Sequence, residues 1–182
     1  MKFIRSKLMP DIVVVEPKVL GDERGFFFES YHEEIFHKNG ITARFVQDNH
    51  SLSDKGVLRG LHYQIAPKAQ AKLVRVIRGS AFDVAVDIRP GSKTFGRCMS
   101  EILSAENKKM IYIPEGFAHG FLSLEDGTEF LYKVSGFYSA KHERGILWND
   151  PVLAIPWPRL DKGYIFSEKD TKYPSLKQAF KI

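Results

Sequence analysis

The stretch Gly56-Val57-Leu58-Arg59-Gly60-Leu61-His62-Tyr63-Gln64 places a guanidinium, an imidazole and an amide among apolar residues that favour β-strands. A strand in a sheet buries one face against the core, and a polar group on that face needs a hydrogen-bond partner or a chemical role. Strict alternation puts Arg59 and His62 on opposite faces, whereas a bulge at Gly60 would bring them to the same face. The stretch therefore predicts a strand with a bulge at Gly60 and a functional inner face.

This stretch and a second run, Pro114-Glu115-Gly116-Phe117-Ala118-His119, resemble the two signature motifs of the cupin β-barrels. In a metal-binding cupin the first motif supplies a second histidine and then a glutamate. Here Gln64 stands in place of that histidine, and the glutamate is also replaced. Because His62 and His119 alone are fewer ligands than a first-row metal site requires, we expect a barrel without a metal ion.

Length and composition indicate one ordinary globular domain. The chain has 182 residues, of which 43% are hydrophobic and 27% charged, a range unlike that of disordered or membrane chains. The 27 Lys and Arg residues against 22 Asp and Glu give a net charge of +5, which favours a phosphorylated ligand. The basic residues are scattered and accompany no nucleic-acid-reading motif, so we expect no nucleic acid partner.

Cysteine usage and the first residues indicate the compartment. Cys98 is the single cysteine, which excludes an internal disulfide and fits a reducing environment. The segment 1–10 is interrupted by Lys2, Arg5 and Lys7 and has no apolar run of signal-peptide length. We therefore expect a cytoplasmic protein that does not bind a membrane.

Regularly spaced turn residues predict an antiparallel all-β fold, closed or sandwiched as in a jelly roll. Turn chemistry occurs at residues 53–56, 78–80, 89–92 and 125–128. The strongest strand patterns lie between these turns, at 73–77 and 82–88. In the second of them Phe82, Val84, Val86 and Ile88 alternate with Asp83, Ala85, Asp87 and Arg89. We expect the charged series to face solvent.

Two short helices are expected outside the barrel. Ser30-Tyr31-His32-Glu33 has the form of a capping box, basic residues follow in the last turn, and Gly40 would end the helix. A second helical segment is expected at 175–180. We predict one domain over residues 1–182, with a strand and helix extension at about 1–50, a barrel at about 51–150 and a C-terminal packing segment at about 151–182.

Further motifs, found in a fixed order along nearly the whole chain, make the sequence similar to the dTDP-4-dehydrorhamnose 3,5-epimerases, a family of dTDP-sugar epimerases. They are Gly21-Asp22-Glu23-Arg24-Gly25-Phe26-Phe27, Phe45-Val46-Gln47-Asp48-Asn49-His50-Ser51, Lys72-Leu73-Val74-Arg75, Phe130-Leu131-Tyr132-Lys133, Trp148-Asn149-Asp150-Pro151 and Ser167-Glu168-Lys169-Asp170. The resemblance implies a cupin-type double-stranded jelly-roll barrel with short peripheral helices.

The activity that the resemblance implies is cofactor-free 3,5-epimerisation of dTDP-4-dehydro-6-deoxy-D-glucose to dTDP-4-dehydro-L-rhamnose. The C4 ketone acidifies the protons at C3 and C5, so the reaction needs a base, a cation for the enolate oxygen and an acid on the opposite face. The resemblance places the base on His62, aligned by Asp170, the cation on Lys72 and the acid on Tyr132. Histidine, with an ordinary pKa of about 6.5, suits a base near neutrality.

The resemblance also implies a nucleotide site and a homodimer. It assigns substrate contacts to Arg24, Glu29, Gln47, Asn49, Arg59, His119, Tyr138, Glu143 and Lys169. Tyr138 matches a position that stacks on thymine, and arginines suit the pyrophosphate. The run Gly25-Phe26-Phe27-Phe28-Glu29 has successive apolar residues, which favour a dimer interface with this strand near the partner's site.

Other interpretations stay open at the level of sequence. The same base and acid would serve a mono-epimerase acting on a related dTDP-4-keto-deoxysugar. A non-catalytic sugar-nucleotide-binding cupin would not need His62, Tyr132 and Asp170 together, and a metal-dependent oxygenase would need ligands that Gln64 and Ala69 do not supply. Without the resemblance, His62 and Tyr132 would be interpreted as hydrogen-bonded core residues, and Arg59 and Lys72 as surface side chains.

Overall fold

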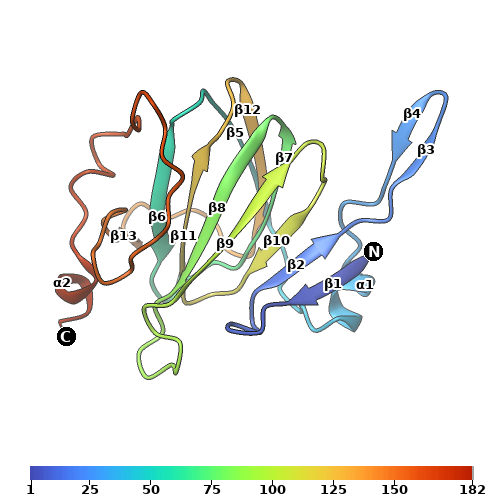
Figure 1. Ribbon diagram of the computed structural model, residues 1–182. Helices are drawn as coiled ribbons and strands as arrows, with labels where there is room; N and C mark the ends of the chain where they lie inside the picture. The colour runs from blue at the N-terminus through green and yellow to red at the C-terminus, as the bar shows by residue number, and fades with distance from the viewer. Residues whose placement is uncertain (182) are drawn as a thin grey trace.

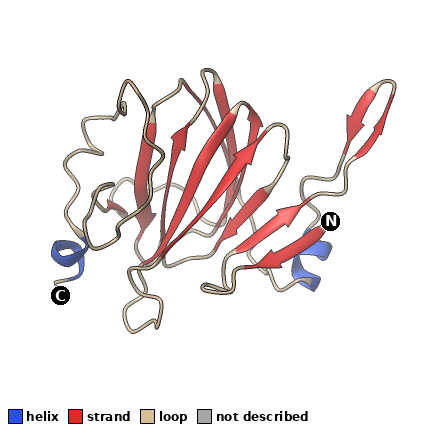
Figure 2. Cartoon of the chain, viewed as in Figure 1, coloured by secondary structure: helices blue, strands red, loops and turns tan. Residues whose placement is uncertain are grey.

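The structure, a computed structural model, describes residues 1–181 and consists mainly of two β-sheets that face each other (Figures 1 and 2). In order, the six-stranded sheet contains β1 (Lys2–Arg5), β2 (Val13–Glu16), β10 (Met110–Ile113), β7 (Lys72–Arg78), β12 (Thr128–Val134) and β5 (Gln47–Ser53). The five-stranded sheet contains β13 (Glu143–Gly145), β6 (Leu58–Gln64), β11 (Phe117–Ser123), β8 (Ser80–Asp87) and β9 (Cys98–Ser104). Every ladder within these sheets is antiparallel, which confirms the predicted all-β cupin-type architecture, although no ladder between the described strands joins the two sheets.

The space between the sheets holds the main hydrophobic core. Val74 and Ile111 of the six-stranded sheet pack with Phe121 of the five-stranded sheet. Phe130 is fully buried and stacks on Phe121 with ring centroids 4.1 Å apart. These two aromatic rings join the sheets, and polar side chains occupy the interior beside them.

The orientation of β8 contradicts the sequence prediction. Its alternating apolar residues, such as Val84, belong to a second core with Leu153 and Leu176, whereas Ala85 faces the core between the sheets. The charged series is therefore not exposed: Asp83 and Asp87 are both 0% accessible to solvent. The prediction was wrong because both faces of β8 are covered, so alternation alone does not identify the solvent side.

The covering layer is the C-terminal segment, shown in orange to red beside the five-stranded sheet in Figure 1. Trp157 contacts Phe82 with ring centroids 5.7 Å apart, and Phe180 lies 6.4 Å from Tyr63. Helix α2 (Leu176–Phe180) is capped by Ser175, whose side chain forms a capping box with Gln178. The predictions of a second helix and of a tail that packs back onto the barrel are confirmed.

Helix α1 (Glu33–Lys38) forms near the predicted position but without the predicted capping box. Its N-cap is His32, which makes no side-chain capping hydrogen bond, so the prediction of a cap at Ser30 was wrong. Packing of the fully buried Phe36 against Phe3 and Tyr31 fixes this helix instead. Among the described residues, no helix has the length and apolar character needed to cross a membrane.

A β-bulge in β6 confirms the sequence prediction at Gly60. His62 pairs with His119 and Arg59 pairs with Phe121, so β6 uses one residue more than β11 over this interval. Gly60 has a φ of +140°, and a Cβ atom there would lie 2.5 Å from the Cα atom of Gly120. The bulge turns Arg59 and His62 to the same cavity, which requires glycine at this close approach.

Candidate active site

A cavity of about 640 Å³ between the two sheets brings together all four predicted catalytic residues. His62 comes from β6, Lys72 from β7, Tyr132 from β12 and Asp170 from the C-terminal segment. A neighbouring cavity of about 240 Å³ shares His62, Lys72 and Tyr132 with the first. Four separate parts of the chain therefore build one site.

His62 forms a close pair with Asp170. The distance from Nε2 of His62 to Oδ1 of Asp170 is 2.5 Å, and Asp170 is only 2% exposed. Burial favours the neutral form of Asp170, but the hydrogen bonds with His62 and Ser167 and the nearby charge of Lys169 help to hold the pKa of this carboxyl below its ordinary value. An ionised carboxylate only accepts, so His62 donates through Nε2 and keeps Nδ1 as the nitrogen that can take a proton.

Lys72 brings a positive charge to the cavity. Its Nζ atom donates to the backbone oxygen of His62 at 3.4 Å, across the space between the sheets. Burial lowers the pKa of Lys72 from its ordinary value to about 8, and the carboxylates of Asp83 and Glu143 oppose this shift. Lys72 is therefore mostly protonated at neutral pH, in a position to stabilise a negative oxygen.

Tyr132 and His62 reach the cavity from facing sheets. Tyr132 stands on β12 of the six-stranded sheet, whereas His62 stands on β6 of the five-stranded sheet. Burial raises the pKa of the Tyr132 hydroxyl above its ordinary value, so this group is protonated at neutral pH. A ligand held between the two sheets would meet a base on one side and a proton donor on the other.

Arg59 and His119 line the same cavity beside the predicted catalytic residues. Nε of Arg59 donates to Oγ of Ser53 at 3.1 Å, which fixes the guanidinium at the cavity wall. Nε2 of His119 lies 2.8 Å from Oδ2 of Asp83. Burial lowers the pKa of His119, so its imidazole is neutral near pH 7 and donates to Asp83.

The outer part of the site contains the other predicted binding residues of the body of the protein. Gln47 donates to Asn49 at 2.8 Å, and both line the smaller cavity. Glu143 accepts from the Tyr138 hydroxyl at 3.1 Å and from Nζ of Lys169 at 2.8 Å. These amide, carboxylate and phenol groups offer the donors, acceptors and ring face that a nucleobase needs.

Gln64, which replaces a metal ligand in the cupin motif, holds the loop that carries Tyr138. Its Nε2 donates to the backbone oxygens of Lys68 and Phe137, and its Oε1 accepts from the backbone nitrogen of Ser139 at 2.6 Å. Among the described residues, no cluster of three His, Cys, Asp or Glu side chains is arranged to hold a metal ion. A metal-free reaction stays a prediction.

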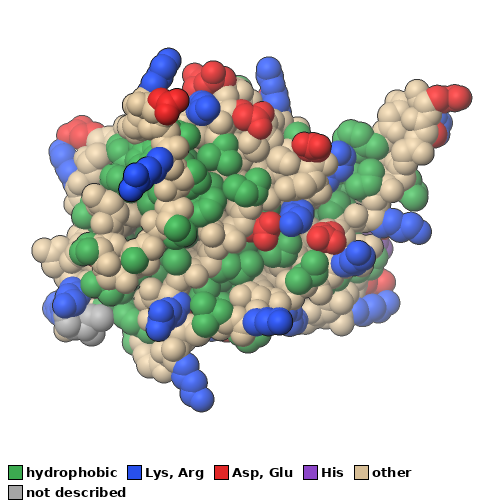
Figure 3. Space-filling model, viewed as in Figure 1, with side chains coloured by type: hydrophobic (Ala, Val, Ile, Leu, Met, Phe, Trp, Pro, Cys, Tyr) green, Lys and Arg blue, Asp and Glu red, His purple; other side chains and the backbone are tan. Residues whose placement is uncertain are grey.

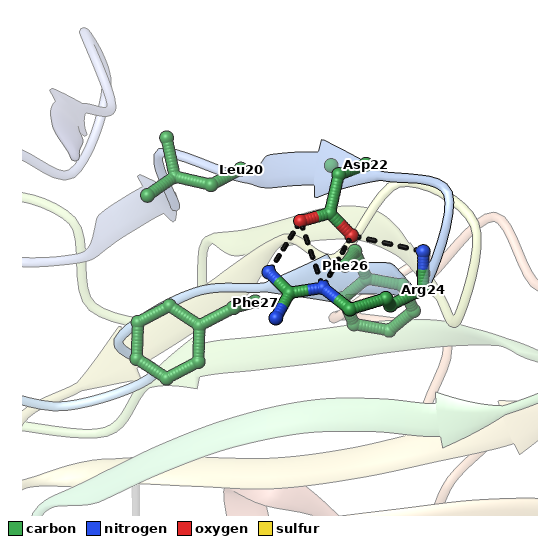
Figure 4. Close-up of a pocket in the computed structure, with 7 residues that line it drawn as sticks. Leu20, Asp22, Arg24, Phe26 and Phe27 are labelled. Carbon is green, nitrogen blue, oxygen red and sulfur yellow. Dashed lines mark hydrogen bonds and ion pairs between the residues drawn. The ribbon is translucent and has the colours of Figure 1, made fainter.

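Two predicted substrate-binding residues, Arg24 and Glu29, line neither cavity. Arg24 belongs to the hairpin of β3 (Leu20–Asp22) and β4 (Gly25–Phe27), which projects from the body in Figure 1. There it pairs with Asp22 at 2.5 Å beside a hollow of about 560 Å³ that Leu20, Phe26 and Phe27 also line (Figure 4). Glu29 is exposed just after this hairpin. The fold of one chain does not bring these two residues to the cavity.

Three residues of the site were missed from the sequence. Asp83 holds His119, the ring of Tyr173 lies 5.6 Å from that of His62, and Ser51 lines the cavity with a buried Oγ atom that has no partner among the described residues. Alternation along β5 could have placed Ser51 on the face of Asn49. No local pattern identifies Tyr173, which reaches His62 only through the fold of the C-terminal segment.

Comparisons with known proteins agree with this geometry. The sequence profile of the dTDP-4-dehydrorhamnose 3,5-epimerases matches residues 6–178. The chain is 57% identical to the dTDP-4-dehydrorhamnose 3,5-epimerase of Pseudomonas aeruginosa, over 89% of both chains, and 55% identical to that of Shigella flexneri, over 93% of both. Its fold is similar, with a TM-score of 0.93, to the crystal structure of dTDP-6-deoxy-D-glucose-3,5-epimerase from Legionella pneumophila in complex with dTDP-4-keto-L-rhamnose, at 48% identity over 97% of this chain and 93% of that one. The chain belongs to the dTDP-4-dehydrorhamnose 3,5-epimerase family.

Proposed function

We propose that this chain epimerises dTDP-4-dehydro-6-deoxy-D-glucose at C3 and C5 to give dTDP-4-dehydro-L-rhamnose, without a cofactor. The observation that carries the proposal is the position of His62 and Tyr132 on facing sheets of one cavity, with Lys72 beside them. Inversion of a carbon requires proton removal from one face and proton return to the other, and this arrangement supplies both.

In the proposed reaction, Nδ1 of His62 takes the proton from the carbon next to the C4 ketone. The electron pair of the broken C–H bond moves to the C4 oxygen, where the Lys72 ammonium stabilises the enolate. The Tyr132 hydroxyl then gives its proton to the opposite face of the same carbon. Asp170 stabilises the imidazolium that forms on His62, and proton exchange with solvent restores both groups.

Binding of the nucleotide is proposed for the outer part of the site. Gln47, Asn49 and Glu143 supply hydrogen-bonding groups for the thymine edge, and the Tyr138 ring supplies a stacking face. Arg59 and Lys169 provide positive charge for the pyrophosphate, and His119 contacts the sugar. This division keeps the reacting sugar beside His62 and Lys72.

The test is incubation of the protein with the dTDP-4-keto sugar in deuterated water, followed by NMR. Each epimerised carbon gains one deuteron from solvent, so the proposal predicts deuterium and inversion at both C3 and C5. A mono-epimerase would invert only one carbon, and a non-catalytic binding protein would leave both unlabelled. Either of these results would replace the present proposal.

We further propose a homodimer in which the β3–β4 hairpin of one subunit lies at the cavity of the other. Leu20, Phe26 and Phe27 are 55%, 63% and 66% exposed, and Figure 3 shows hydrophobic side chains gathered where this hairpin leaves the body. A projecting two-stranded hairpin is marginal alone, and an exposed apolar patch favours a protein interface. Such a dimer would bring Arg24 and Glu29 to the partner's substrate.

We also propose a cytoplasmic location, which the free Cys98 fits.

Mixing two inactive variants tests this dimer. Arg24→Ala would lack its contribution to the partner's site, and His62→Ala would lack its own base. In a two-fold dimer, random exchange of the two variants should restore about a quarter of the sites, because half of the dimers are mixed and each has one complete site. If Arg24 served its own subunit, no site in the mixture would be complete and activity would not return.

A further inference from the structure

Asp83 is a charged group in the interior of the protein that the proposed reaction does not use. It stands in the middle of β8 and is 0% accessible to solvent. Its Oδ2 accepts from Nε2 of His119 at 2.8 Å, and its Oδ1 has no hydrogen-bond partner among the described residues. Because burying a carboxylate with incomplete pairing is costly, its presence here favours an electrostatic role.

The charge of Asp83 is not neutralised by its hydrogen-bond partner. Burial lowers the pKa of His119, and the positive charge of Lys72 lowers it further, whereas Asp83 raises it. The neutral imidazole donates one hydrogen bond but carries no positive charge. The hydrogen bond to His119 therefore brings no positive charge to the buried Asp83 carboxyl group, and His119 in turn lines the same cavity as the Lys72 ammonium.

Charged and titratable groups from several elements line the cavity with Lys72. They are Arg59 and His62 on β6, His119 on β11, Tyr132 on β12, Glu143 on β13 and Lys169 in the C-terminal segment. Asp83 on β8 adjoins this cavity through its hydrogen bond to His119. Burial lowers the pKa of Lys72, and Asp83 opposes this shift more strongly than Glu143 does. Glu143 also shares its charge with Lys169, whose Nζ lies 2.8 Å away.

We propose that Asp83 is a positioning residue whose buried negative charge keeps Lys72 protonated inside the barrel, while its hydrogen bond fixes the orientation and tautomer of His119. A neutral amine at Lys72 would have little power to stabilise an enolate oxygen, so loss of the Asp83 charge would weaken the site without touching the substrate. The catalytic consequence rests on the proposed function, whereas the effect on the Lys72 proton does not.

The informative change is Asp83→Asn, because it removes the charge and keeps the shape. The amide oxygen of Asn can still accept from Nε2 of His119, so the imidazole keeps its partner. A matched control is Asp87→Asn on the same strand. Asp87 is also 0% exposed, but its carboxylate pairs with Arg89, Ser92 and Thr94 rather than with the cavity. The control loses an equally buried charge away from Lys72.

The first measurement needs no substrate. Protein labelled with carbon-13 at the lysine Cε atoms is titrated by NMR, and the Lys72 signal is assigned by its disappearance in Lys72→Arg. The wild-type signal should titrate with a pKa of about 8. In Asp83→Asn the midpoint should fall by at least about one pH unit, and in Asp87→Asn it should stay in place. An unmoved midpoint in Asp83→Asn would overturn the proposal.

The second measurement is the pH dependence of kcat. In Asp83→Asn the alkaline limb should move to lower pH together with the Lys72 midpoint, with a smaller effect on KM. In the Lys72→Arg background, where the cation stays charged, the same Asp83 change should no longer move the limb. A uniform loss of kcat without a shift would identify Asp83 as merely structural and contradict the proposal.

A variant that keeps the charge covers the case in which Asp83→Asn does not fold. Asp83→Glu should leave the Lys72 midpoint within a few tenths of a pH unit of wild type, since a single negative charge remains. A midpoint that falls despite the retained charge would overturn the proposal. If the wild-type protein had no epimerase activity, the proposed function would fail, and the Lys72 titration would still decide the role of Asp83.

Discussion

Replacement of Gly60 by alanine should damage stability and catalysis together, because the bulge at this residue sets both the strand spacing and the site. A Cβ atom at Gly60 would lie 2.5 Å from Cα of Gly120 and 3.2 Å from the backbone oxygen of His119. Ordinary carbon–carbon contacts lie at about 3.5–4.0 Å, so β6 and β11 must separate locally by about 1 Å. Both neighbours are backbone atoms, which no side-chain rotation can move away.

The expected magnitude has two parts. The φ of +140° at Gly60 costs a residue with a side chain about 1–3 kcal/mol, and the overpacking costs about 1–3 kcal/mol more. Gly60→Ala should therefore lower the free energy of unfolding by about 2–6 kcal/mol. Since Arg59 and His62 flank the bulge, a displacement near 1 Å should also lower kcat by about 10²-fold.

The matched control is Gly91→Ala in the loop after β8. Gly91 has a φ of +79° but no atom within 4 Å of its added Cβ, so it has the backbone strain without the contact. Thermal unfolding and epimerase turnover would be measured for both variants under the same conditions. The reasoning is refuted if Gly60→Ala is no less stable than Gly91→Ala, or if it folds and keeps wild-type kcat.

Four further predictions concern the chemistry. His62→Ala should abolish epimerisation and solvent exchange with a loss of about 10²–10⁴-fold, and near-normal exchange in this variant would assign the base elsewhere. Asp170→Asn should keep the fold but weaken that base, visible as a lower exchange rate at unchanged thermal stability within a few degrees. Tyr132→Phe should still exchange substrate protons while forming little inverted product, and an exchange-to-inversion ratio equal to that of wild type would exclude Tyr132 as the acid. Exhaustive chelation should leave turnover intact, because Nε2 of His62 and of His119 each lies against a carboxylate; bound metal whose removal stops turnover would contradict this.

The sequence alone determined the features that depend on local patterns. Glycine-rich turns separated the strands, and the polar residues of the stretch around His62 predicted an inner functional face. The bulge at Gly60 followed from the same local pattern, because Arg59 and His62 could share a face in no simpler way. The family motifs then predicted which residues are catalytic, although they gave no geometry.

Tertiary structure alone decided which faces are buried and which distant groups meet. The alternation in β8 was recognised, but its charged face was assigned to solvent, because no local pattern indicates that a segment some 70 residues later covers the apolar face. The fold also brings Asp83 to His119, and the same C-terminal segment brings Asp170 to His62. Such contacts depend on chain closure over long separations, so they appear only when the two sheets and their covering layer are assembled.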